Sequence, residues 1–61
     1  DAAHQRLAAQ ILRSWLRESH ANLPAWTPPD VANAYVGLLA AVQRLIDATT
    51  LAEREESRRH V

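Results

Sequence analysis

The first apolar pattern of the chain recurs at helical spacing between Ala2 and Ala21. Strong helix formers separate its members, which are Leu7, Ala8, Ile11, Leu12, Trp15 and Leu16. Asn22 suits a left-handed position after the last turn, and Pro24 cannot continue a helix. The sequence therefore predicts a first helix over residues 2–21.

A second and longer pattern starts at Pro28 and is close to a heptad. Residues recur every seven positions in three series: Val31, Leu38, Leu45 and Ala52; Ala34, Ala41 and Ala48; and Tyr35, Val42 and Thr49. No proline interrupts the stretch, so we expect a loop over 22–27 and a second helix over 28–59. After Ala52 the chain is polar on every side, and we expect that end to fray or to extend into solvent.

The start of the second helix carries a recognisable set of signals. Thr27 fits the N-cap, and Asp30 fits the third helical position, from which its carboxylate can reach the Thr27 amide. Trp26 and Val31 then occupy the positions of a hydrophobic staple. The sequence predicts a capping box and a staple, with the cap displaced by one residue if Pro29 prevents helical geometry in the residue before it.

Both helices carry apolar arcs about 200° wide, whereas one packed neighbour needs only about half of that. Counted from the loop, the first helix covers the second only to about Ala48, so Leu51 and Ala52 lack a partner within the chain. These features predict an all-α fold, an antiparallel two-helix hairpin that dimerises into a four-helix bundle. The alternative is that flanking segments of a longer chain cover the apolar surface.

The edges of the second helix differ in size. Small residues follow one edge, namely Ala34, Gly37, Ala41 and Ala48, and bulky residues follow the other, namely Tyr35, Leu39, Val42 and Ile46. The bulky first helix suits the bulky edge, so we expect the small edge to form a close seam between protomers. The predicted interface residues are Ile11, Trp15, Ala34, Gly37, Leu38, Ala41, Leu45, Ala48, Leu51 and Ala52.

The two tryptophans each allow two interpretations. Trp15 lies in the middle of its arc and is most simply a core residue. Trp26 is most simply the staple, although a partly exposed loop tryptophan is also a good interface anchor.

Length and charge restrict the class of partner. A chain of 61 residues forms one domain and buries only about 60% of the surface that its unfolded form exposes. Seven arginines balance seven acidic residues, which removes a general attraction to nucleic acid or to an anionic membrane. With no apolar run near the roughly 20 residues of a membrane span and no signal peptide, we expect a cytoplasmic protein without a membrane partner.

Composition adds two further expectations. The chain has no cysteine, so neither a disulfide nor a thiolate metal site can stabilise it. Arginine without lysine, together with abundant alanine, is typical of GC-rich bacterial genomes. The absence of methionine favours a segment of a larger protein.

The groups that could carry chemistry do not converge. None of the histidines has partners at the spacing of a closed metal site: His4, His20 and His60. The serines fall on predicted helices without a glycine-rich turn or oxyanion donors: Ser14, Ser19 and Ser57. We therefore expect no catalytic, metal-binding or cofactor-binding residues, and no enzyme.

Arg6, Arg13 and Arg17 fall within about 40° of one another on the first helix. Such a stripe can bind phosphate, and it makes a nucleic-acid-binding accessory protein one alternative. A solvated face opposite the core is the simpler interpretation, because the net charge is zero and no aromatic residue lies between the arginines. Nucleic acid is thus an unlikely partner.

The sequence as a whole indicates a non-catalytic interaction module that pairs with itself or with another helical protein segment. In size and pattern it is similar to the two-helix segments that join subunits of bacterial multi-enzyme assemblies, such as polyketide synthase docking domains, although it carries no diagnostic motif of theirs. The alternative is a small helical regulator, antitoxin-like or anti-sigma-like, that occludes a partner's surface.

Overall fold

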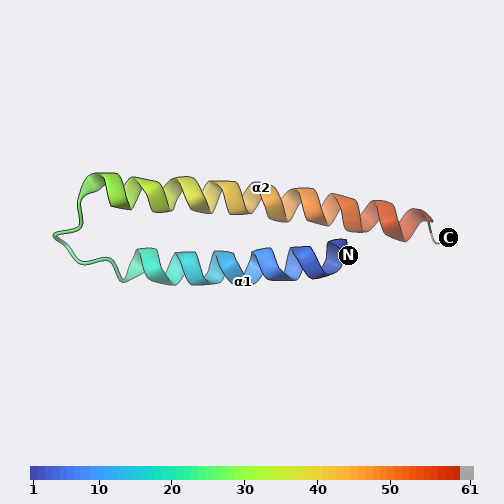
Figure 1. Cartoon of the computed structure of the whole chain (residues 1–61), viewed down its shortest axis with the longest axis horizontal. Coiled ribbons are helices and arrows are strands. Elements are labelled where there is room, and N and C mark those ends of the chain that lie inside the picture. Colours follow the sequence, from blue (N-terminus) through green and yellow to red (C-terminus); the bar gives the residue numbers. More distant parts are fainter. Residues whose placement is uncertain (60–61) are drawn as a thin grey trace.

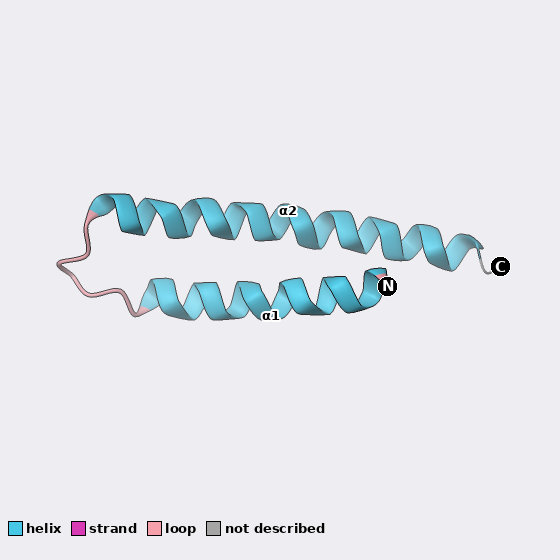
Figure 2. Cartoon of the chain, in the orientation of Figure 1, coloured by secondary structure: helices cyan, strands magenta, loops and turns pink. Residues whose placement is uncertain are grey.

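Two long helices lie side by side and antiparallel, joined by a loop at one end (Figure 1). The computed structural model describes residues 1–59. Helix α1 spans Ala2–Ala21 and helix α2 spans Pro29–Arg59. The described residues contain no strand, which confirms the predicted all-α hairpin (Figure 2). With 31 residues against 20, α2 extends past the first turn of α1 at the open end.

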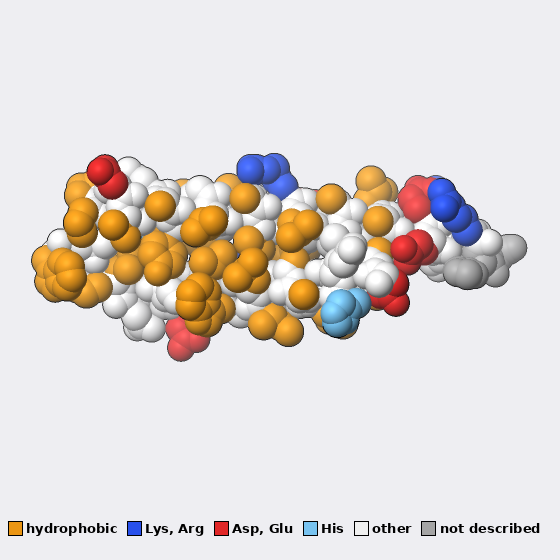
Figure 3. Space-filling view, viewed as in Figure 1, with side chains coloured by type: hydrophobic (Ala, Val, Ile, Leu, Met, Phe, Trp, Pro, Cys, Tyr) orange, Lys and Arg blue, Asp and Glu red, His pale blue; other side chains and the backbone are white. Residues whose placement is uncertain are grey.

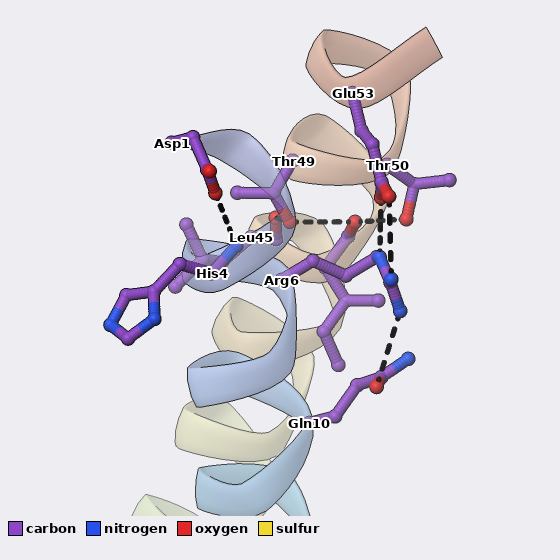
Figure 4. Close-up of polar contacts among 9 residues, drawn as sticks. Asp1, His4, Arg6, Gln10, Leu45, Thr49, Thr50 and Glu53 are labelled. Carbon is purple, nitrogen blue, oxygen red and sulfur yellow. Dashed lines mark hydrogen bonds and ion pairs between the residues drawn. The ribbon is translucent and has the colours of Figure 1, made fainter. Parts of the chain in front are cut away.

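Helix α1 begins at a side-chain cap that the sequence pattern did not reveal. Oδ1 of Asp1 accepts a hydrogen bond from the His4 amide at 2.8 Å (Figure 4). This contact satisfies a backbone donor of the first turn, and it places a carboxylate at the positive end of the helix dipole.

The predicted left-handed residue at the end of α1 was wrong. Asn22 has φ −96° and ψ 8°, and its amide donates to the Glu18 carbonyl at 3.1 Å. The next amide, that of Leu23, donates to the His20 carbonyl at 3.2 Å. The tightened last turn satisfies these carbonyls, so no left-handed residue is needed.

The start of α2 also differs from the prediction, because the capping box does not form. The amide and the hydroxyl of Thr27 both donate to the Pro24 carbonyl, at 3.0 and 2.6 Å, and close a turn. Because the hydroxyl is used in this turn, it does not cap α2. Helix α2 begins at Pro29, one residue later than expected. Pro28 and Pro29 have no N–H group, and the amide of Val31 donates to the Pro28 carbonyl at 3.1 Å. Few donors are therefore left for a capping side chain to satisfy.

The helices meet along a seam whose residues alternate in steps of three and four, as in a coiled coil. The buried cluster consists of Ala9, Leu16, Val42 and Ile46, with Tyr35 and Leu39 packed against it. The prediction that the bulky edge of α2 faces α1 is thus confirmed. The expected rotation of α1 was wrong, since Trp15 keeps 60% of its surface exposed and α1 instead presents Ala9 and Leu16.

Polar side chains of α1 complete the seam. Nε of Arg6 donates to Oε2 of Glu53 at 2.5 Å (Figure 4), and Nη1 of Arg13 donates to Oε1 of Gln43 at 2.7 Å. Because Arg6 reaches Glu53, α1 covers α2 well beyond Ala48, contrary to the prediction. The seven residues between the helices make a loop long enough for α1 and α2 to pair in this register.

The hairpin is long and thin, and its core is small. Its principal extents are 54 × 15 × 11 Å, and its radius of gyration is 14.9 Å. A compact domain of this length has a radius of gyration of about 10.5 Å. Within residues 1–59 no large side chain falls below 2% exposure. Two helices alone therefore do not enclose a complete hydrophobic core.

Candidate functional site

Large apolar side chains are exposed on both helices. On α1 the exposed fractions are 51% for Leu7, 71% for Ile11, 43% for Leu12 and 60% for Trp15. On α2 they are 43% for Val31, 55% for Val36, 51% for Leu38, 47% for Leu45 and 59% for Leu51. Scattered exposed leucines are ordinary, whereas a contiguous group of exposed apolar side chains is unusual for a single folded chain.

Most of these side chains share one face of the hairpin. A shallow groove of about 470 Å³ near the loop is lined by Trp15 and Leu16 of α1 and by Val31, Ala34 and Leu38 of α2, among others. Steps of 100° per residue place Ala8 and Leu12 on the Trp15 side of α1 and Ile11 at the outer margin of that side, whereas Leu7 falls beyond the margin. They place Ala41, Leu45, Ala48 and Ala52 on the Leu38 side of α2. We call this surface the apolar face.

The charged groups border the apolar face. In the space-filling view, hydrophobic side chains run over both helices from the loop to beyond the middle, and charged side chains lie at the edges and at the open end (Figure 3). Glu18 lies about 20° beyond Ile11 on the outer edge of α1, and Arg44 lies about 40° beyond Ala48 on the outer edge of α2. An apolar centre with a charged rim is the usual composition of a protein–protein interface.

The predicted interface residues fall mostly on this surface. Ile11 and Trp15 lie on the α1 half, and Leu38 and Leu45 lie on the α2 half with Ala34, Ala41, Ala48 and Ala52, all of them exposed. Gly37 lies at the margin, and a Cβ atom added there would meet no atom within 4 Å. Leu51 does not belong to the apolar face, since it lies about 120° around the helix from Leu45. Leu12, which was in the predicted arc but not in the predicted interface, completes the face.

The structure does not bring the three arginines together as a free anion-binding surface. Arg6 is engaged by Glu53 and Gln10, and Arg13 is engaged by Gln43, so both lie at the seam and neither is on a solvated face opposite the core. Of the three arginines, only Arg17 is exposed. The hydrogen bond and the charge of Glu53 raise the pKa of Arg6 above its usual range, so this guanidinium stays protonated.

The loop presents an isolated aromatic side chain. Trp26 keeps 80% of its surface exposed and Val31 keeps 43%, so the predicted hydrophobic staple is not formed. Asp30 is exposed and borders the groove, while Thr27 is half-buried by its turn. Trp26 is the most exposed large apolar residue among those described.

A second hollow lies near the open end and is polar. It has a volume of about 490 Å³ and is lined by Arg6, Gln10, Thr50, Glu53, Arg54 and Ser57. The Arg6–Glu53 pair and the Arg6–Gln10 hydrogen bond join three of its polar side chains to one another (Figure 4). The Thr50 hydroxyl donates to the Ile46 carbonyl at 2.7 Å. We therefore assign these groups to the fold.

Residues 1–59 contain neither a cluster of metal ligands nor a membrane-spanning helix. No three His, Asp or Glu side chains in this range are arranged to hold a metal ion. Neither helix contains a stretch apolar and long enough to cross a bilayer within the part described. His60, one of the histidines considered from the sequence, lies outside the described residues.

No known protein family, curated protein or solved structure matches this chain, so its function is inferred from its own residues.

Proposed function

We propose that the chain is a non-catalytic protein–protein interaction module whose apolar face associates with a second copy to form a four-helix bundle. The observation that carries this proposal is the apolar face itself: Ile11, Leu12, Trp15, Val31, Leu38 and Leu45 are each 43–71% exposed. Docking to another helical segment would bury the same residues, but a two-fold dimer needs only a second copy of this chain.

The exposed area supports a large interface. The hairpin exposes 4765 Å², whereas a compact monomer of its mass exposes roughly 3,950 Å². A compact dimer of twice the mass exposes roughly 6,600 Å². Reaching that value from two separate hairpins buries roughly 3,000 Å² in total, which is the size of an obligate homodimer interface.

The seam of the hairpin is compatible with this role. It leaves the small residues Ala34, Ala41 and Ala48 free on the α2 half of the apolar face. Small side chains let helices approach at the short end of the 8–10 Å range of interaxial distances. These exposed alanines therefore provide a surface on which the predicted close seam between protomers can form.

Sedimentation equilibrium of matched variants tests the proposal. The parent chain should sediment as a dimer, with twice the 6.8 kDa mass of the monomer. Leu12→Glu and Leu38→Glu should both sediment as monomers, because each puts a charge within the buried surface. Val36→Glu is the control, since Val36 is 55% exposed but lies about 160° around α2 from Leu38.

Two outcomes contradict the proposal. A parent chain that stays monomeric and helical at millimolar concentration would show that the hairpin does not pair with itself. If Val36→Glu dissociates the dimer as strongly as Leu38→Glu does, the association uses a surface other than the apolar face.

A further inference from the structure

We infer that the second copy packs with its loop at the same end, so that α1 of each copy lies on α2 of the other. This inference rests on the proposed function and specifies the geometry of the same face. Two hairpins can stack face to face in two ways with two-fold symmetry. An axis parallel to the helices places α1 on the partner's α2, and an axis across the helices places α1 on α1 and α2 on α2, with the loops at opposite ends.

The contacts within the hairpin show which residues would meet. An axis parallel to the helices does not shift the copies along their length, so each α1 residue lies level with the same α2 residue in the partner as in its own chain. Arg13 is level with Gln43, and the rings of His20 and Tyr35 are 5.9 Å apart. Trp15 is thus level with the partner's Ala41.

Side-chain size favours this stacking. The α1 half of the face carries Ile11, Leu12 and Trp15 within five residues, whereas the α2 half alternates Val31, Leu38 and Leu45 with alanines at 34, 41, 48 and 52. Bulky side chains pack best opposite small ones, so that both layers keep one separation. The other stacking would set two bulky helices against each other and two alanine-rich helices against each other, which would wedge the layers apart at α1.

The rim charges favour the same stacking. With the axis parallel to the helices, the outer edge of α1 meets the outer edge of the partner's α2. Glu18 then lies about seven residues, or about 10 Å along the helix, from the partner's Arg44, within reach of two long side chains. With the axis across the helices, the outer edges of the two α2 helices meet. Arg44, near the midpoint of residues 31–52 along α2, would then face the partner's Arg44, which is repulsive.

Electron-spin distance measurements test the arrangement directly, because the chain has no cysteine of its own. A spin label is attached to Ala25→Cys in the loop or to Ser57→Cys near the open end, both exposed positions. Loops at the same end predict a distance of about 20 Å between the two labels in both variants, the width of two helices. Loops at opposite ends predict distances close to the 54 Å length of the hairpin.

A charge exchange provides the second measurement. Arg44→Glu and Glu18→Arg should each weaken the dimer by about three- to tenfold, and the double variant should recover the parent affinity. Arg58→Glu is the control, since Arg58 lies on the part of α2 beyond α1. Recovery in the double variant requires that the two residues belong to opposite copies at short range, because no ion pair joins them within the chain.

The outcomes separate this inference from the proposed function. A dimer with long distances for both labels overturns the arrangement and leaves the apolar face as the interface. A dimer with short distances but no recovery in the charge exchange keeps the arrangement and overturns the proposed contact between Glu18 and the partner's Arg44. If the chain sediments as a monomer, the proposed function is overturned, and the arrangement of the two copies is overturned with it.

Discussion

Thr27 stabilises the turn between the helices by hydrogen bonding twice to one acceptor. Its hydroxyl and its amide both donate to the Pro24 carbonyl, at 2.6 and 3.0 Å. The two contacts close a four-residue turn immediately before the two prolines that start α2. The loop is thus held by Thr27 and by the fixed φ angles of the prolines.

Thr27→Ala removes the hydroxyl bond and leaves the amide bond in place. We expect the free energy of unfolding to fall by about 0.5–1 kcal/mol, the usual net contribution of one exposed hydrogen bond. Thr27→Ser keeps the hydroxyl and should lose less. Urea unfolding followed by circular dichroism measures the difference, and an alanine variant as stable as the parent would show that the turn does not depend on this contact.

The capping prediction failed because sequence spacing does not show which acceptor a hydroxyl will use. Thr27 and Asp30 have the spacing of a capping box, but the adjacent prolines remove two of the donors that a cap would satisfy. Pro24 offers a carbonyl at the distance of a turn, and Thr27 uses it. Asp1, by contrast, caps α1 without any periodic signal beside it, because a cap needs only one side-chain oxygen and a free amide.

At the scale of the helices, the bounds of α1 followed from the pattern but its rotation did not. The apolar arc indicates which residues tend to leave water, and its centre is Trp15 and Ala8. The observed seam lies at one edge of that arc, where Arg6 and Arg13 find oxygen partners on α2. Hydropathy assigns arginine to solvent, so it could not reveal that these two residues face the neighbouring helix.

The end of α2 is expected to contribute little to the hairpin. The residues from Arg54 to Arg59 are exposed, and their ion pair, between Arg58 and Glu55 at 3.7 Å, is local. Removing residues 55–61 should leave the melting temperature and the helical content per residue nearly unchanged. Thermal melts by circular dichroism measure both quantities.

A deeper truncation is the control for this prediction. Removing residues 53–61 also deletes Glu53 and leaves the charge of Arg6 without its partner, so the melting temperature should fall clearly. If the two truncations melt at the same temperature, the Arg6–Glu53 pair does not stabilise the seam. If the shorter truncation already lowers the melting temperature, the end of α2 makes a contact that its exposure does not reveal.

For the whole molecule, the length of the chain and the width of the apolar arcs on both helices already indicated that one hairpin cannot bury its apolar surface. The structure shows this in its thin shape and in its lack of a large side chain below 2% exposure in the described part. Which face would remain open depended on the rotation of α1, and the sequence alone did not determine that rotation. The edge of α2 that stays exposed could be identified from the sequence, because a heptad repeat defines the two edges of a helix independently of its partner.

Association should therefore make the stability of the hairpin depend on concentration. When folding is coupled to dimer formation, the melting temperature should rise by about 5 °C for each tenfold increase in concentration. Melts of the parent chain over three decades of concentration measure this slope. Leu38→Glu should melt at one lower temperature throughout, and a flat curve for the parent would show that the hairpin is stable without a partner.

The different positions of the two tryptophans give the chain an intrinsic optical signal. Trp15 lies within the apolar face and Trp26 lies on the loop, and both are exposed to water in the single hairpin. Indole emission shifts to shorter wavelength when water leaves its surroundings. Pairing through the apolar face would therefore shift the emission of Trp15 and leave that of Trp26 at longer wavelength. A Trp26→Phe chain would report association through Trp15 alone, without any attached dye.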